Sequence, residues 1–336
     1  MAIATDRIRL SDVAQVAGVS VATASKALNG TGRMTLETRE RIKQIAADLG
    51  FRPNAMARAL ISQRSFTVGL LTNDTYGRFT LPVMAGVSEA LVDEGVSVFL
   101  CGIEDDPALG RVHVDAMLDK QVDGIILSGK RIDKRLPVDL SEISVPIVYV
   151  FTEAPDDAVS LVSDDAQGAH EAVEWLVSIG RRRLVHVTGP KSFASVRERA
   201  GAFTQVAGES AEILYGSWSE AWGHSAVDQL CSAETDLPDG IFCGNDQIAR
   251  GVVDALRERH IAVPRDVSVV GFDNWEIVSA ATRPPLTSVD MNLKALGREA
   301  GRLILELSGG RHVEPGIRKL PCKLVVRESC GGAAPA

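Results

Sequence analysis

The pattern of apolar and polar residues changes once along the chain, near residue 65. Before that point, apolar side chains recur every three or four residues in short stretches, which predicts small amphipathic helices. After it, short apolar runs alternate with longer amphipathic stretches, as is typical of βαβ units around a mainly parallel sheet. We therefore expect an all-α N-terminal headpiece followed by a larger α/β body.

The N-terminal pattern predicts a helix-turn-helix. Ser11 is placed to cap a first helix, Gly18 to make a tight turn, and Ser20 to cap a second helix that ends near Asn29. A third helix is expected over 36–49. The apolar residues at helical spacing are expected to form the small core: Val13, Ala14, Ala17, Val19, Ala24, Ala27, Leu28, Ile42, Ile45, Ala46 and Leu49.

The remaining residues predict two α/β lobes. Strands are expected over 67–71, 96–100, 124–127, 147–151, 184–187, 240–243, 267–270 and 322–326. Expected helices between them include 81–94, 168–179, 246–259 and 293–307. A body of about 265 residues is long enough for two such lobes.

Composition places the chain among ordinary globular proteins. It has 336 residues, of which 45% are hydrophobic and 24% charged. No apolar run reaches the roughly 20 residues of a membrane span, and the first residues lack the apolar stretch of a signal peptide, so we expect a cytoplasmic protein. The five cysteines have no zinc-binding or redox spacing, and we expect free thiols.

Charge is distributed unevenly along the chain. The overall net charge is −8, but residues 1–64 hold ten Lys or Arg and only five Asp or Glu. The basic end is therefore net positive and the rest strongly negative. A basic headpiece on an acidic body favours DNA binding in a single orientation, although chance clustering of surface charge would give the same count.

Motifs of common enzymes are missing from the sequence. There is no P-loop, HExxH or GxSxG, and the six histidines are scattered. We predict no catalytic residue, no metal site and no cofactor.

Five segments carry specific motifs in one order. They are LSDVAQVAGVSVATASKALNG at 10–30, RPNAMARAL at 52–60, FCGNDQIARG at 242–251, VPRDVSVVGFDN at 263–274 and RPPLTSVDMN at 283–292. With these motifs the chain resembles the LacI/GalR family of transcriptional repressors over nearly its whole length. The resemblance implies a body like a periplasmic sugar-binding protein, in which a small molecule between two lobes alters operator affinity.

The resemblance also implies a domain division. A helix-turn-helix domain is expected over 1–53, a hinge helix and linker over 54–65, and a two-lobed effector-binding and dimerisation domain over 66–331. Its N lobe is expected to comprise about 66–162 plus 292–319, and its C lobe about 163–291 plus 320–331. Residues 332–336 are expected to form a disordered tail.

By resemblance, the second helix reads bases from the major groove. Lys26 can donate to guanine, whereas Val21 and Ala22 offer only apolar contact, unless they belong to the headpiece core. The other residues expected at the DNA are Ser11, Thr23, Ser25 and Asn29.

The resemblance extends to the hinge. Asn54 begins it, Ala57 is small enough for two copies to approach, and Leu60 matches a leucine that family members insert into the minor groove. Paired hinges imply a homodimer on a pseudo-palindromic operator. Alternatively, Leu60 is an ordinary apolar residue of a linker.

The effector is expected to contact polar groups and an aromatic face, as a sugar requires. The residues implied by the resemblance, or by their position after a strand, are Asn73, Asp74, Phe79, Phe151, Arg199, Trp218, Asn245 and Asp273. Asp246 is expected to cap a helix. Trp222 and Trp275 are further candidates for the cavity wall or for packing.

Two positions depart from the family pattern. Phe151 stands where many relatives have an aspartate, so it either stacks on a ligand ring or fills the core. Ala202 stands where glycine is usual, and Arg197 competes with Arg199 as the family's arginine. We predict an operator-binding repressor controlled by a small molecule, expected to be a sugar. The alternatives are a periplasmic sugar-binding protein and a regulator whose body binds a protein partner.

Overall fold

The computed structural model describes residues 8–51, 64–209, 211–232 and 237–331. It divides into two compact units, Met1–Ser65 and Phe66–Ala336, which we call the headpiece and the body. Ten residues of the predicted hinge, 54–63, and the predicted tail, 332–336, lie outside the described residues.

The headpiece contains the predicted helix-turn-helix and third helix. They are α1 Leu10–Ala17, α2 Val21–Leu28 and α3 Leu36–Asp48. The turn is possible because Gly18 has a φ of 65°, a conformation that costs glycine little. Ser20 caps α2 as predicted, since its Oγ accepts the N–H of Thr23 at 3.1 Å.

The prediction that Ser11 caps the first helix is wrong. The helix begins at Leu10, and Arg9 is the N-cap residue. The reason is Asp12, whose carboxylate accepts the N–H of Arg9 at 2.7 Å and so places the cap two residues earlier than predicted. Ser11 is exposed and donates to Asp12 at 3.4 Å.

Most of the predicted headpiece core is confirmed. The fully buried residues are Val13, Ala14, Ala17, Ala24, Ala27, Ile42 and Ala46. The larger apolar residues Val19, Leu28, Ile45 and Leu49 are only half-buried and pack around this centre. Alanines at the centre allow the three short helices to approach closely.

The body contains two six-stranded sheets, and each defines a lobe. The N-lobe sheet has the order β11-β5-β4-β3-β1-β2 and the C-lobe sheet the order β12-β10-β9-β8-β6-β7. The N-lobe strands are β1 Thr67–Thr72, β2 Ser97–Gly102, β3 Gly124–Arg131, β4 Ile147–Thr152, β5 Val159–Ser163 and β11 Gly316–Leu320. The C-lobe strands are β6 Leu184–Thr188, β7 Glu212–Tyr215, β8 Gly240–Cys243, β9 Ser268–Asp273, β10 Thr287–Asp290 and β12 Lys323–Val325. Every described pairing is parallel except that of β10 with β12.

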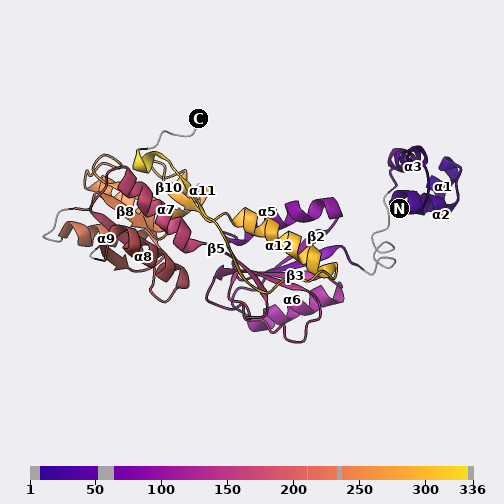
Figure 1. The fold of residues 1–336 in the computed structure, drawn as a ribbon, viewed down its shortest axis with the longest axis horizontal. Coiled ribbons are helices and arrows are strands. Elements are labelled where there is room, and N and C mark those ends of the chain that lie inside the picture. The colour runs from indigo at the N-terminus through magenta and orange to yellow at the C-terminus, as the bar shows by residue number, and fades with distance from the viewer. Residues whose placement is uncertain (1–7, 52–63, 210, 233–236, 332–336) are drawn as a thin grey trace, which may run out of the picture. The chain divides into compact units, whose positions relative to one another are not determined.

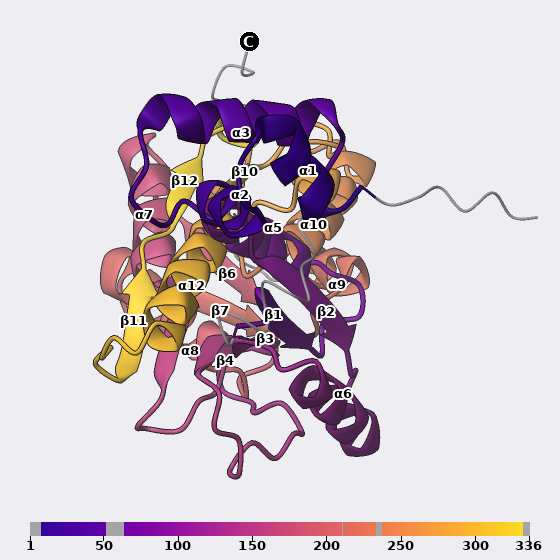
Figure 2. The same ribbon diagram turned by 90° about the vertical axis from the view of Figure 1, so that its right-hand side faces the viewer.

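Helices cover both faces of each sheet. The N lobe has α5 Thr80–Leu91, a 3-10 turn at Val92–Glu94, α6 Pro107–Asp119 and α12 Leu293–Ser308. The C lobe has α7 Asp165–Ser178, α8 Ala194–Ala207, α9 Glu220–Ser232, α10 Asp246–Glu258, α11 Glu276–Ser279 and a 3-10 turn at Glu328–Cys330. In the N lobe, α6 lies on one side of the sheet and α5 with α12 on the other (Figures 1 and 2).

Helices α5 and α12 are in direct backbone contact. A Cβ added to Gly86 would lie 2.0 Å from the carbonyl oxygen of Lys294, and one added to Gly297 would lie 2.0 Å from that of Val83. Side chains at these positions would push the helices apart. This contact holds α12, which follows a C-lobe strand in the sequence, firmly in the N lobe.

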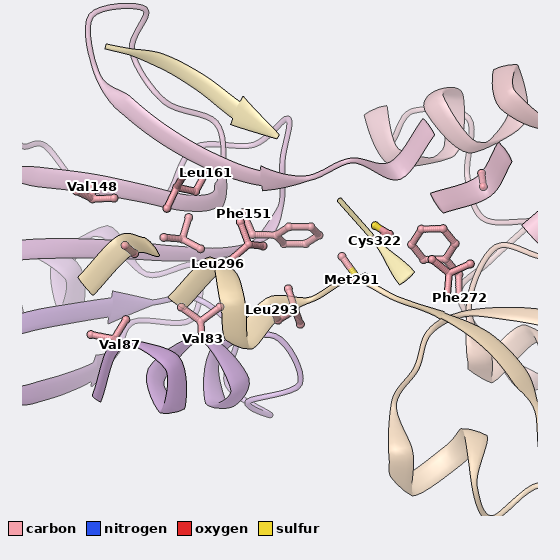
Figure 3. Packing of buried hydrophobic residues seen from close by; sticks show 14 of the residues in the cluster. Val83, Val87, Val148, Phe151, Leu161, Phe272, Met291, Leu293, Leu296 and Cys322 are labelled. Carbon is pink, nitrogen blue, oxygen red and sulfur yellow. The ribbon is translucent and has the colours of Figure 1, made fainter. Parts of the chain in front are cut away.

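The chain passes between the lobes at three described segments that are hydrogen-bonded to one another. Asp164 N–H donates to Leu320 O at 2.8 Å, and Ser163 Oγ donates to Met291 O at 2.7 Å. Apolar side chains continue through the crossing: Figure 3 shows Met291 and Cys322 between Phe151 of the N lobe and Phe272 of the C lobe. The junction is therefore a shared hydrophobic core, not a loose linker.

The α/β prediction is confirmed, and each of the eight predicted strands overlaps an observed one. Four further strands, β5, β7, β10 and β11, were not predicted. The edge strands β7 and β11 are short and mix charged with apolar residues, so they lack a continuous apolar run. Serine or threonine interrupts the apolar residues of β5 and β10.

Candidate functional site

A cavity of about 350 Å³ lies between the lobes of the body. Six of the predicted effector residues line it: Phe79, Phe151, Arg199, Trp218, Asn245 and Asp273. Six lining residues were not predicted: Arg78, Lys130, Arg131, Lys134, Phe193 and Ser195. The wall draws on the carboxyl ends of strands in both sheets, which is where ligands bind to open α/β sheets.

Aromatic rings form two pairs in the wall. Phe79 and Phe151 are stacked with centroids 5.1 Å apart, and Phe193 meets Trp218 edge-on at 5.6 Å. Phe151 is 4% exposed and belongs to the hydrophobic core that joins the lobes. It thus fills the core, as one alternative predicted, and also lines the cavity. Stacking of Phe151 on a ligand ring stays a prediction.

The two tryptophans near residue 220 differ in their surroundings. Trp218 precedes α9 and packs against Gly189, where a Cβ would lie 2.4 Å from the indole. Trp222 is on α9, and its Nε1 donates to Thr188 O at 2.9 Å. Trp218 lines the cavity, whereas Trp222 is not among the lining residues and packs inside the C lobe.

Arg78 crosses from the N lobe to the C lobe through the cavity. Its guanidinium forms an ion pair with Asp273 and donates to Gln247 Oε1 at 2.9 Å. It also lies 5.2 Å from the ring of Phe79 and 5.0 Å from that of Trp275. Burial lowers the pKa of Arg78 to about 10, so it remains a cation at neutral pH.

Arg199 is held by the C lobe itself. It is 3% exposed, and its Nε and Nη2 donate to one oxygen of Asp165 at 2.8 and 2.6 Å. The guanidinium carbon lies 3.6 Å from the ring centroid of Phe272. Its charge is therefore paired, and one face is covered. Arg197, the alternative arginine, is exposed and lies 3.5 Å from Asp133.

The start of α10 assigns different roles to two neighbouring residues. Asn245 is the N-cap, because its Oδ1 accepts Ile248 N–H at 2.8 Å. The prediction that Asp246 caps a helix is wrong: its carboxylate is buried and accepts Trp275 N–H at 2.7 Å and the Ser288 hydroxyl. The cap sits one residue earlier than predicted, which leaves Asp246 free to join α10 to the segment after β9 and to β10 itself.

Asn73 and Asp74 follow β1 but are not among the lining residues of the cavity. Both are buried. Asp74 accepts the N–H groups of Phe79 and Thr80 at 2.7 and 2.9 Å and so holds the start of α5. Asn73 donates to Asp105 at 3.1 Å. Direct ligand contact by either residue stays a prediction.

The lobes are also bridged beside the cavity. Arg131 donates to Ser192 O at 2.8 Å, and the carboxylate of Asp133 accepts the N–H of Ala194, the first residue of α8, at 2.7 Å. These contacts join the end of β3 in the N lobe to the start of α8 in the C lobe. One signal for these residues was present in the sequence, because they directly follow the apolar run of β3 and the carboxyl ends of parallel strands face the site.

The second helix of the headpiece presents the predicted base-reading side chains to solvent. Val21 is 49% exposed, and Ala22 and Lys26 are exposed as well. This exposure excludes the alternative in which Val21 and Ala22 belong to the core. Of the remaining predicted DNA contacts, Ser11 and Asn29 are exposed, while Thr23 and Ser25 are half-buried beside them.

The predicted hinge contacts Asn54, Ala57 and Leu60 lie outside the described residues. Among the residues that the structure describes, no three or more His, Cys, Asp or Glu side chains form a group that could hold a metal ion. No helix in the described part of the chain is long and apolar enough to cross a membrane.

Comparison with known proteins finds a family match in each of the two units. Residues 9–54 match the family of bacterial regulatory proteins of the lacI type, and residues 173–330 match a periplasmic binding protein-like domain. Catabolite control protein A of Priestia megaterium is 30% identical over 96% of this chain and 99% of its own length. The transcriptional regulator CelR of Thermobifida fusca is 31% identical, with 96% and 98% covered.

Two solved structures match nearly the whole chain. The lac repressor dimer bound to operator and the anti-inducer ONPF has a TM-score of 0.73 at 28% identity, covering 97% of this chain and 99% of that one. A complex of CelR with cellobiose has a TM-score of 0.67, also at 28% identity, with 96% and 100% covered.

A helix-turn-helix headpiece followed by a two-lobed body with an interlobe cavity defines a DNA-binding transcriptional regulator. The chain belongs to the lacI family of bacterial regulatory proteins. Its matched relatives are regulators and not enzymes, as the sequence predicted.

Proposed function

We propose that this protein represses transcription from a specific operator and that a sugar bound in the interlobe cavity controls its affinity for that operator. The observation that carries the proposal is the cavity itself, whose aromatic and polar wall comes from both lobes. A ligand there contacts both lobes at once. It therefore favours one lobe arrangement over another by the difference in its affinity for the two.

The solved structures of relatives support a sugar as the effector. The CelR structure contains cellobiose. In this chain, the two aromatic pairs of the wall can cover the apolar face of a sugar ring, and Asn245, Ser195 and Asp273 offer hydrogen-bonding groups. Phe79, Phe151, Trp218 and the buried Arg199 complete the proposed contacts that line the cavity.

The proposed DNA contacts follow the domain division predicted from the sequence. Residues 1–53 bind DNA, 54–65 form the hinge and 66–331 the effector-binding body, with the two lobes meeting near 162, 291 and 320. On α2, Lys26 reads a guanine, and Val21 and Ala22 contact thymine methyl groups. Phosphate contacts by Ser11 and Asn29 fix the register.

The proposed assembly is a homodimer in the cytoplasm, where the operator is. Two copies place two headpieces on a pseudo-palindromic site, and hinge residue Leu60 is inserted into the minor groove between the half-sites. The relative in the lac repressor complex is a dimer on its operator.

The test is selection of bound sequences from a random DNA pool, with and without a panel of sugars. We expect one enriched pseudo-palindrome and at least one sugar that changes its recovery. Enrichment of no sequence would contradict the operator-binding part. An enriched operator whose recovery no sugar changes would contradict control by a sugar. Thermal shift measurements on the full chain provide an independent readout, because a sugar well above its Kd raises the Tm.

A further inference from the structure

The wall of the interlobe cavity contains far more positive than negative side chains. Of its lining residues, five are Lys or Arg, and Asp273 is the one carboxylate. Two of the five cations have a buried carboxylate to themselves, since Arg78 pairs with Asp273 and Arg199 with Asp165. The other three, Lys130, Arg131 and Lys134, lie together where β3 ends. Each of them shares its carboxylate partner with a second cation.

Two lysines at this end of the cavity share one carboxylate. Lys130 Nζ lies 3.4 Å and Lys134 Nζ 3.2 Å from Asp105. Hydrogen bonds from Asn73 and Lys134 lower the pKa of Asp105, so it is ionised. A single carboxylate cannot neutralise two ammonium groups. The two lysines are about half exposed, which leaves them able to turn toward a ligand.

The neighbouring arginine shares its carboxylate in the same way. Asp133 lies 2.6 Å from Arg131 and 3.5 Å from Arg197, and it also accepts the N–H of Ala194. The Arg131 guanidinium lies 3.8 Å from the centroid of the Phe193 ring. The cationic end of the cavity is therefore next to its aromatic wall.

Other carboxylates near the cavity do not offset these charges. Asp74 and Asp246 act on Arg78 electrostatically, but neither lines the cavity. Asp74 accepts the N–H groups at the start of α5, and Asp246 accepts the N–H of Trp275 and the hydroxyl of Ser288. The scarcity of carboxylates also matters for a neutral sugar, because its hydroxyl groups need acceptors and Asp273, which is shared with Arg78, is the one lining carboxylate.

We infer that the effector is an anionic sugar derivative, whose carboxylate or phosphate group binds at Lys130, Arg131 and Lys134 and whose ring packs on the aromatic wall. The inference rests on the proposed function, since it names the class of effector for the same cavity. Sugar acids and sugar phosphates share the required chemistry: an anionic group with several acceptor oxygens next to a ring with an apolar face. Lysine and arginine then make charge-assisted hydrogen bonds that a neutral sugar cannot receive with equal strength.

The test measures anion binding by the full chain and by four variants. The probes are inorganic phosphate, glucuronate, glucose 6-phosphate and neutral glucose, at constant ionic strength with chloride as reference. The readouts are the Tm shift and titration calorimetry. The double variant Lys130→Ala/Lys134→Ala removes the pair, Asp105→Asn removes their shared carboxylate, and Lys130→Arg/Lys134→Arg keeps the charge. Lys120→Ala, at the end of α6 over the ring of Phe99, is the matched control.

We expect at least one anion to stabilise the wild type more than glucose does. The double alanine variant should bind that anion about tenfold more weakly, because two charge-assisted contacts are lost. Asp105→Asn should bind it several-fold more tightly, and the arginine and Lys120 variants should stay close to the wild type. Glucuronate and glucose 6-phosphate distinguish carboxylate from phosphate as the favoured group.

Equal anion binding by the wild type and the double alanine variant would overturn the inference, because the anion then binds elsewhere, for example at the basic headpiece. Failure of all three anions to stabilise the wild type would also overturn it.

The same experiment distinguishes failure of this inference from failure of the proposed function. If glucose stabilises wild type and double variant alike and changes operator recovery, sugar control stands and the anionic class is wrong. If an anion binds at the lysine pair without changing operator recovery, the site stands and its regulatory role is wrong.

Discussion

Arg78 on the N lobe forms an ion pair with Asp273 on the C lobe, and both side chains are largely buried. Arg78 lies between two aromatic rings, and Asp273 ends β9 with a φ of 100°. The pair therefore holds the lobes together at the cavity.

Asp273→Asn should weaken the contact between the lobes, because it leaves the Arg78 cation without its carboxylate. Breaking a buried pair from one side costs about 3 kcal/mol, or the lobes separate to let water reach Arg78. Small-angle X-ray scattering should show a larger radius of gyration, and urea unfolding a lower stability. In a double-mutant cycle, Arg78→Gln should recover part of the loss caused by Asp273→Asn. Strictly additive losses would show that the two side chains do not interact.

Phe151 is expected to matter for stability and for cavity shape together. Phe151→Ala removes the ring stacked on Phe79 and opens the core between the lobes, so we expect a loss of about 3–5 kcal/mol in urea unfolding. Phe151→Leu keeps most of the volume and should cost less than half as much. Equal losses from both variants would mean that the ring's size does not contribute to packing.

The sequence predicted element types well where the pattern was long and periodic. Helix α10 has one apolar face and one polar face along more than three turns, and central strands such as β3 and β8 begin with or consist of an apolar run. The edge strands β7 and β11 were missed because each mixes charged with apolar residues, and a run such as GIRKL in β11 does not differ from a loop in composition.

Half of the residues that line the cavity were predicted from the sequence, and the other half were not. Residues predicted from the resemblance to the family, such as Arg199 and Asn245, line the cavity, although their side chains also make hydrogen bonds within the protein. Arg78, Lys130 and Lys134 belong to no quoted motif. Each of these three residues is more than 100 positions from Asn245 in the sequence, and only the folding of the two lobes brings them to the same cavity. No local sequence pattern contains that information.

Asp246 should make stability depend on pH. Burial raises the pKa of Asp246 to about 7, against 3.8 as its ordinary value, although Ser288, Trp275 and Arg78 act in the opposite direction. Between those values the folded protein holds a proton that the unfolded chain has released. The stabilising contribution is therefore complete below about pH 4 and is lost as the pH rises through 7, by at most about 1.4 kcal/mol per pH unit.

Urea unfolding of wild type and Asp246→Asn at pH 5, 6, 7 and 8 tests this. The asparagine has a fixed cost, since its NH₂ group cannot accept from both Ser288 and Trp275. The difference in unfolding free energy between wild type and variant should shrink as the pH rises from 5 to 7. A constant difference over that range would show that Asp246 is ionised throughout.

Lys26 is expected to set base preference and not only affinity. Lys26→Ala should relax the preference at one position of each half-site by about 1–3 kcal/mol, because an ammonium donor to guanine is lost. The matched control is Lys43→Ala, which removes the same charge from α3, where Lys43 pairs with Glu40. It should leave the preferred sequence unchanged. A uniform affinity loss across sequences for Lys26→Ala would identify a phosphate contact instead.

Two glycines of the C lobe should respond in opposite ways to a single methyl group. A Cβ at Gly189 would lie 2.4 Å from the indole of Trp218, so Gly189→Ala must displace this part of the cavity wall. We expect a loss of about 1–3 kcal/mol, as for other overpacked sites, and a change in tryptophan fluorescence.

Gly201 is exposed on α8, and a Cβ there has no neighbour within 4 Å among the atoms outside its own turn. Gly201→Ala should therefore stabilise the body by about 0.5–1 kcal/mol, because alanine loses less backbone entropy in a helix. Urea unfolding of both variants, with fluorescence recorded in the folded state, gives the two signs in one experiment. Stabilisation by Gly189→Ala, with unchanged fluorescence, would show that Trp218 does not rest on Gly189 in solution.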